Sequence, residues 1–225
     1  MKGLTAEQVT EFTDEGFLVV KDFLNPAEDL DPIIKEYEGV LDRLAESLFA
    51  KGEITSTHAD KDFSERLIHV CQESRKVQAQ HFDFSLPQKN IQADTPIWTG
   101  PAIFNALRNV KLLDAVESLI GPEIYSNPVQ HVRLKLPEHR GVADEAGQLV
   151  QGVTPWHQDN GVVLAEADET DMITVWFALW DAPIESELHD AAQWAALWRE
   201  AQRKIVAEGK ETFFNRWDAN AEVCA

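Results

Sequence analysis

Apolar residues recur at three- and four-residue steps through much of the first 120 residues, the periodicity of helices that bury one face. Thr5 and Gln8 have the spacing of a capping box, so a helix should begin directly after Thr5 and end at Gly16. A longer apolar stripe begins near Pro26 and continues to Gly52. The periodicity predicts helices over residues 6–15, 26–52, 63–74 and 102–120.

The period changes to that of strands after residue 122. In residues 129–136, for example, alternate side chains would face opposite sides of a sheet. The tail is helical again, with Asp190 as its cap and Gly209 at its end. Strands are predicted over residues 17–20, 124–126, 129–136 and 172–180. We therefore expect one α+β domain over residues 1–225, made of a mainly helical part (1–122), a β-rich part (123–181) and a helical tail (182–225).

Length and charge narrow the classes of function. A chain of 225 residues is long enough for one domain with a sizeable core. The 20 Lys and Arg residues against 39 Asp and Glu give a net charge of −19, which disfavours nucleic acid and anionic membranes as partners. The 44% hydrophobic content and seven tryptophans predict a folded chain rather than a disordered acidic one.

Cysteine usage and the absence of targeting signals bear on the compartment. Cys71 and Cys224 are far apart and have no metal-ligand spacing, which favours a reduced intracellular protein. No run of 18 apolar residues and no secretory signal are present. We expect a soluble, cytoplasmic protein.

The candidate chemistry lies in the triplet His157-Gln158-Asp159. On a strand, residues i and i+2 point to the same face, so this imidazole and this carboxylate could converge on one ion. With a second histidine they would form the facial triad of non-haem Fe(II) oxygenases. A zinc hydrolase built on the same pair lacks another firm ligand and a general base.

Two further His-x-Asp triplets occur, so the spacing alone is weak support. His58 and Asp60 lie in a polar stretch and are expected in a solvated turn. His81 and Asp83 are expected in an ordinary edge strand or loop. The third copy differs because it precedes the Asn160-Gly161 turn and then the long apolar run of residues 172–180.

Residues 156–160 and 173–181 resemble the core of the phytanoyl-CoA dioxygenase family of Fe(II)/2-oxoglutarate oxygenases, and further motifs extend the resemblance over residues 1–181. It implies a double-stranded β-helix (jelly roll, cupin-like), here incomplete, with flanking N- and C-terminal helices. It also implies that His157 and Asp159 bind iron, that Trp176 lies beside 2-oxoglutarate, and more loosely that Lys135 lines the same pocket. The alternatives are a core aromatic for Trp176 and a solvated strand residue for Lys135.

The family pattern also requires a distal histidine ligand and then an arginine for the far carboxylate of 2-oxoglutarate. His189 and Arg199 are the candidates by chain order. On one helix, ten residues correspond to about 15 Å of rise and leave the two side chains some 80° apart. The alternatives are a His189 near a helix terminus with Arg199 exposed, and His131 or His139 as the third iron ligand.

The segment between the long predicted strand and the helical tail is too short to complete a barrel. A jelly roll has about eight strands, and the missing ones would need roughly 35 to 45 residues. Only residues 182–189 stand there, so we expect a family member that lacks an internal segment. Exposed strand edges would then favour a homodimer.

Two functions follow from this interpretation. The first is a dioxygenase that uses Fe(II) and 2-oxoglutarate to hydroxylate a small organic substrate. The second is a catalytically inactive or truncated relative that acts as a binding or interaction protein. The acidic composition mildly disfavours a polyanionic CoA ester as the substrate.

Overall fold

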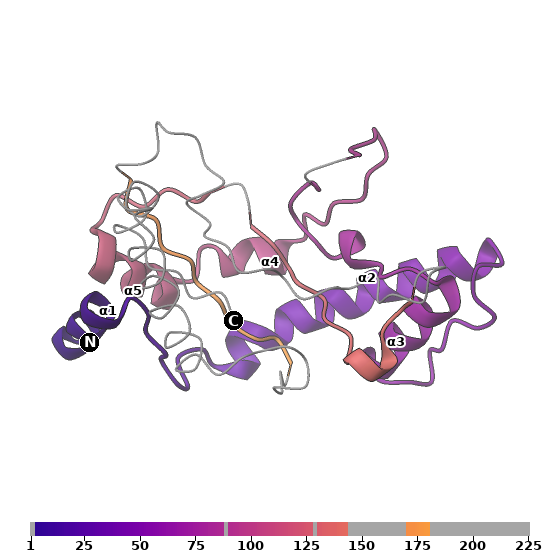
Figure 1. Cartoon of the computed structure of the whole chain (residues 1–225), viewed down its shortest axis with the longest axis horizontal. Coiled ribbons are helices and arrows are strands. Elements are labelled where there is room, and N and C mark those ends of the chain that lie inside the picture. Colours follow the sequence, from indigo (N-terminus) through magenta and orange to yellow (C-terminus); the bar gives the residue numbers. More distant parts are fainter. Residues whose placement is uncertain (1–2, 88–89, 128–129, 144–169, 181–225) are drawn as a thin grey trace, which may run out of the picture.

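The computed structural model of the chain describes residues 3–87, 90–127, 130–143 and 170–180 (Figure 1). Helices dominate this part of the chain. Its helical elements are α1 (Ala6–Glu15), the π-helical turn η1 (Pro26–Leu30), α2 (Asp31–Ala50), α3 (Phe63–Ser74), the 3₁₀ turn η2 (Ala79–His81), α4 (Pro101–Ala106), α5 (Val110–Ile120) and the 3₁₀ turn η3 (Glu138–Arg140).

Helix α1 confirms the predicted capping box. Thr5 Oγ1 accepts from the Gln8 backbone N–H at 3.2 Å, and Gln8 Oε1 accepts from the Thr5 N–H at 2.9 Å. The helix ends at Gly16, whose φ of 81° is the left-handed conformation that glycine adopts without a steric penalty. The preceding segment ties this region to α5, because Leu4 N–H donates to Ser118 Oγ at 3.0 Å (Figure 1).

Helix α2 provides the largest share of the core and runs along the molecule (Figure 1). Its buried side chains recur at three- and four-residue steps, as the sequence predicts. They are Ile33, Tyr37, Val40, Leu41, Leu44, Ala45 and Leu48. Helix α3 packs on this face with Leu67, Ile68, Val70 and Cys71. Cys71 is a buried free thiol, and burial raises its pKa.

The single helix predicted over residues 102–120 is wrong, because the structure has two. Helix α4 ends at Ala106, and α5 begins at Val110 with Asn109 as its N-cap. The Asn109 side chain accepts from the backbone N–H groups of Lys111 at 2.9 Å and Leu112 at 3.4 Å. An asparagine that caps a new helix competes with continuation of the old one, so the apolar periodicity spans a break.

The described residues contain no strand ladder in the ranges where strands are predicted. Residues 17–20, 124–126, 130–136 and 172–180 run as irregular connections, and residues 79–81 form the turn η2. Side chains of two of these connections still pack on the helical core, among them Leu134, Leu136, Phe177 and Leu179. Trp180 stacks on Phe63 with ring centroids 4.4 Å apart. The incomplete jelly roll stays a prediction.

Among the described residues, no helix combines the length and apolar character that crossing a bilayer demands. The predicted C-terminal helix and residues 144–169 of the predicted β-rich part lie outside the described residues.

Candidate functional site

The predicted oxygenase site falls partly within the described residues. Trp176 is 41% exposed and therefore does not belong to the buried core, whereas Lys135 is half-buried. The alternative of Trp176 as a core aromatic is thus wrong for this structure. The remaining predicted site residues, His157, Asp159, His189 and Arg199, lie outside the described residues. Their convergence on one ion stays a prediction.

His131, one of the alternative iron ligands, is paired with a carboxylate. Its Nδ1 lies 2.8 Å from Asp83 Oδ2, and Asp83 Oδ1 accepts from the Val132 N–H at 3.2 Å. Asp83 is buried, and the Asp83 carbonyl also accepts from the Trp98 N–H at 2.8 Å. A carboxylate on Nδ1 fixes the orientation of an imidazole and leaves Nε2 as its other ring nitrogen.

The His81-x-Asp83 triplet does not form an ion site of its own. The Asp83 carboxylate is directed to His131, while His81 ends the turn η2. Burial lowers the pKa of His81, and the nearby Lys51 lowers it further. A neutral imidazole is therefore favoured near pH 7. The other alternative ligand, His139, is exposed in η3.

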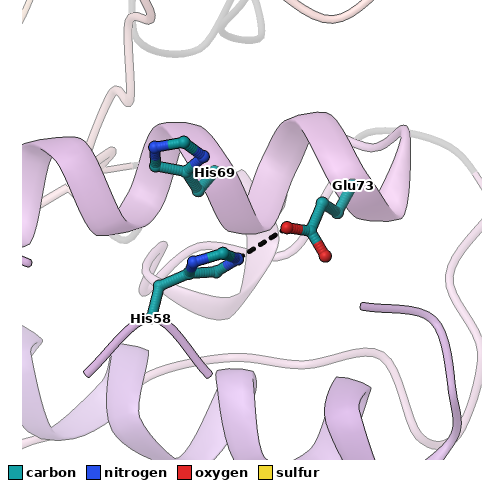
Figure 2. Close-up of side chains that lie close together, drawn as sticks. All are labelled: His58, His69 and Glu73. Atoms are coloured by element: carbon teal, nitrogen blue, oxygen red, sulfur yellow. Dashed lines mark hydrogen bonds and ion pairs between the residues drawn. The ribbon is translucent and has the colours of Figure 1, made fainter. Parts of the chain in front are cut away.

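The expectation that the His58-x-Asp60 triplet lies in a solvated turn is only partly correct. His58 does lie at a turn, with φ of 50°, but its side chain is only 13% exposed. Its Nε2 lies 2.6 Å from Glu73 Oε1 on α3, and its ring stacks on that of His69 with centroids 4.9 Å apart. Figure 2 shows the two imidazoles and the carboxylate facing one another.

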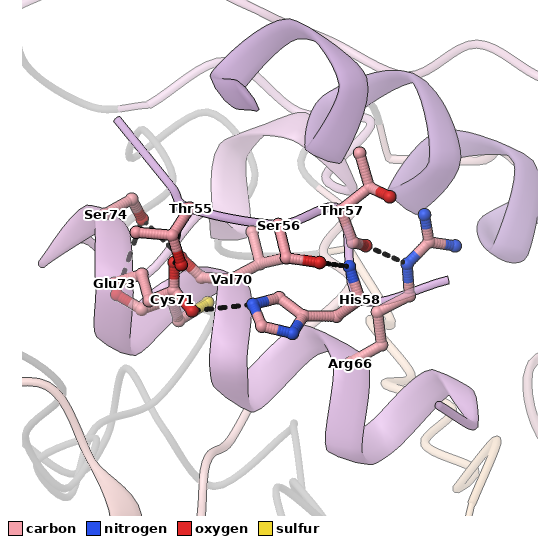
Figure 3. A network of polar contacts seen from close by, with 9 residues as sticks. All are labelled: Thr55, Ser56, Thr57, His58, Arg66, Val70, Cys71, Glu73 and Ser74. Atoms are coloured by element: carbon pink, nitrogen blue, oxygen red, sulfur yellow. Dashed lines mark hydrogen bonds and ion pairs between the residues drawn. The ribbon is translucent and has the colours of Figure 1, made fainter. Parts of the chain in front are cut away.

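A polar network surrounds this histidine cluster and ties residues 55–58 to α3 (Figure 3). Glu73 Oε2 accepts from the Thr55 N–H at 2.6 Å and from Thr55 Oγ1 at 2.8 Å. Arg66 Nε donates to the Thr57 carbonyl at 2.8 Å. Hydrogen bonds from Thr55 and His58 hold the pKa of Glu73 below its usual range, and the backbone bond contributes most. Glu73 is therefore a carboxylate at neutral pH.

Helical spacing could have revealed two of the three members of this cluster. His69 and Glu73 are four residues apart on a helix that the sequence predicts, so their side chains are neighbours on one face. His58 comes from a loop 11 residues before His69, and no periodicity predicts where a loop folds back.

A groove of about 330 Å³ lies beside the start of α2 and α4. Its lining includes Ile33, Pro101 and Ala102 together with the acidic Glu28 and Asp29. Asp29 is already engaged, because it accepts from Asn109 Nδ2 at 2.7 Å and Lys111 Nζ at 3.0 Å. The acidic side chain of Asp29 therefore links η1 to the start of α5 and is not available as a catalytic group of the groove.

Comparison with known proteins identifies the family. The family model described as phytanoyl-CoA dioxygenase matches residues 12–186, which is most of the chain and includes His157, Asp159, Lys135 and Trp176. No curated protein and no solved structure gives a significant match. His189 and Arg199 follow the matched span. The chain belongs to the phytanoyl-CoA dioxygenase family.

Proposed function

We propose that the chain is a non-haem Fe(II)/2-oxoglutarate-dependent dioxygenase that hydroxylates a small organic substrate. The observation that carries the proposal is the family match over residues 12–186, which includes the His157-Gln158-Asp159 triplet. Family membership implies that the chain belongs to the Fe(II)/2-oxoglutarate oxygenase superfamily. We propose in addition that this chain itself catalyses the hydroxylation.

The donor set of the triplet fits ferrous iron. His157 supplies an imidazole and Asp159 a carboxylate, which are two of the three ligands of a facial triad. Both ligands bind a metal only when deprotonated, so iron affinity should fall as the pH drops below the pKa of the histidine. Bound iron would supply the oxygen chemistry that couples decarboxylation of 2-oxoglutarate to hydroxylation of the substrate.

The other residues of the site would position the co-substrate. We propose that Trp176 forms one wall of the 2-oxoglutarate pocket and that Lys135 lines it. The 41% exposure of the Trp176 side chain supports this role, since the indole is not consumed by core packing. His189 would be the third ligand and Arg199 the partner of the distal carboxylate, with His131 as the alternative ligand held by Asp83.

The substrate is proposed to be a free small molecule rather than a CoA thioester. A net charge of −19 repels a polyanionic ligand unless a local basic pocket offsets it. This electrostatic argument concerns the substrate class alone and leaves the iron chemistry unchanged.

An inactive relative that serves as a binding protein is the second candidate. It is favoured by one observation, which is that the matched span ends at residue 186, before His189 and Arg199. In that case the chain would lack turnover of 2-oxoglutarate even if His157 and Asp159 retained metal.

Anaerobic equilibrium dialysis against Fe(II) tests the proposed iron site. We expect His157→Ala and Asp159→Asn each to bind one equivalent less than the wild-type chain. His81→Gln, which removes a histidine of the turn η2 outside the proposed site, is the matched control and should bind as the wild type does. Equal Fe(II) binding by all four proteins would refute the assignment of His157 and Asp159.

A further inference from the structure

We propose that His58, His69 and Glu73 form a second divalent-cation site, distinct from the His157/Asp159 triplet, and that Zn²⁺ is the ion its ligand chemistry favours. One ligand atom from each of the three side chains lies within 4.8 Å of the other two. His69 and Glu73 lie one turn apart on α3, and His58 approaches from the loop before this helix (Figure 2). Two imidazoles and one carboxylate are a common ligand set for zinc, with water in the fourth position.

The distances require only small side-chain movements. Zn–N and Zn–O bonds of about 2.0–2.2 Å place tetrahedral ligand atoms roughly 3.4 Å apart. His58 Nε2 and Glu73 Oε1 are now 2.6 Å apart, as in a hydrogen bond, and the two rings are stacked at 22°. A cation between them would replace the hydrogen bond, and rotation of the imidazoles would bring both nitrogens into range.

The carboxylate is already oriented for this role. Glu73 Oε2 is occupied by two hydrogen bonds from Thr55, so Oε1 is the oxygen directed at His58 (Figure 3). Hydrogen bonds of this kind to the outer atoms of a ligand are typical of metal sites. The backbone of His58 is held as well, because the His58 backbone N–H donates to Ser56 Oγ at 3.1 Å.

The site would have a structural effect. Its ligands join the loop of residues 53–62 to α3, in parallel with the bond from Arg66 Nε to the Thr57 carbonyl. Bound metal would therefore hold this loop closed and protect peptide bonds after Lys51 and Lys61 from trypsin. This proposal is independent of the oxygenase site, since its residues are on different segments.

Zn²⁺ binding in the His157→Ala background separates the two sites. We expect that variant to bind one equivalent of Zn²⁺ in equilibrium dialysis, and the double variant His157→Ala/His69→Gln to bind at least tenfold more weakly. The double variant His157→Ala/His81→Gln is the matched control and should keep the full equivalent. Equal binding by the two double variants would overturn the proposal and indicate only a structural His58–Glu73 pair.

Thermal unfolding of the His157→Ala protein provides a second readout that does not depend on the variant at His69. At Zn²⁺ about 100 times above Kd, the Tm should rise by roughly 5 to 10 °C, and a chelator should reverse the shift. Trypsin should also cleave after Lys51 and Lys61 more slowly with Zn²⁺ than with chelator. An unchanged Tm together with unchanged cleavage would contradict the site.

Discussion

At the scale of single residues, the Tyr37 hydroxyl is the least satisfied group of the core. Its side chain is buried against Phe82, with ring centroids 5.7 Å apart, and the oxygen has no hydrogen-bond partner among the described residues. Burial of this hydroxyl raises its pKa strongly. A buried unsatisfied hydroxyl costs about 1–3 kcal/mol.

Tyr37→Phe should therefore leave the free energy of unfolding unchanged or raise it by about 1 kcal/mol, because it removes the unsatisfied oxygen and keeps the ring. Urea unfolding measures this difference. Leu41→Ala is the contrasting variant, since it opens a cavity in the same face of α2 and should cost about 2–5 kcal/mol. A loss above 2 kcal/mol for Tyr37→Phe would mean that the hydroxyl has a partner.

His81 should make stability depend on pH. Its pKa in the folded chain is lower than the usual 6.5, first because of burial and then because of Lys51. The unfolded chain therefore binds the proton more readily, so stability is full above about pH 6.5 and falls as the pH drops below it. In His81→Gln, the urea concentration at the unfolding midpoint should therefore fall less between pH 6.5 and pH 5 than it does in the wild type. An equally steep fall in His139→Gln and His81→Gln would contradict this.

Residue types can be read from the sequence, but their pairings depend on the fold. The three His-x-Asp triplets are equivalent in spacing, yet His58 pairs with Glu73 and Asp83 pairs with His131. These contacts join segments 15 and 48 residues apart. Local periodicity carries no information about such distances along the chain.

At the scale of elements, Glu36 links α2 to the start of α4. Its carboxylate accepts from Trp98 Nε1 at 2.9 Å and from the N–H groups of Ala102 at 2.7 Å and Ile103 at 3.2 Å. A carboxylate at a helix N-terminus satisfies N–H groups that have no partner within the helix. A Cβ at Gly100 would lie 2.3 Å from Glu36 Cδ, so a larger residue there would have to displace the Glu36 carboxylate.

Glu36→Gln should lower the free energy of unfolding by about 1–3 kcal/mol, because one acceptor oxygen becomes a donor facing backbone N–H groups. Glu38→Gln, at an exposed position of the same helix, is the matched control and should stay within about 0.5 kcal/mol of the wild type. Chemical unfolding of both variants tests this. Similar losses at the two positions would show that the carboxylate of Glu36 has no special role.

Helices were predictable where their signals are local. The capping box of α1, the apolar stripe of α2 and the bounds of α3 follow from neighbours in sequence. The division between α4 and α5 was missed because Asn109 interrupts a stripe whose apolar period continues. Strands depend on partners elsewhere in the chain, so alternation alone could not establish them.

At the scale of the whole molecule, we propose a homodimer. Large apolar side chains are exposed on several described segments, among them Phe49, Phe104, Val110 and Tyr125. A second copy could cover such surface, whereas the net charge of −19 opposes association at low salt.

Sedimentation velocity should therefore show a dimer whose fraction rises with salt, because salt screens the repulsion between acidic subunits. Sedimentation at the same protein concentration in low and moderate salt makes the comparison. A monodisperse monomer in both conditions would contradict the proposed dimer.

Family membership was predictable from motifs in chain order, and the family match confirms it. The geometry of the oxygenase site stays a prediction. Of the six residues assigned to it, only Trp176 and Lys135 fall in the described part of the chain. A shared set of motifs identifies ancestry, whereas coordination requires that side chains from distant segments meet.

Decarboxylation of 2-oxoglutarate tests the central claim most directly. The wild-type chain with Fe(II) and oxygen should release CO₂ from 2-oxoglutarate, while His157→Ala should lose at least 100-fold of this rate and His81→Gln should keep it. His69→Gln should also keep the rate, since it alters only the proposed zinc site. No Fe(II)-dependent release above the His157→Ala level would contradict the dioxygenase assignment and favour the binding protein.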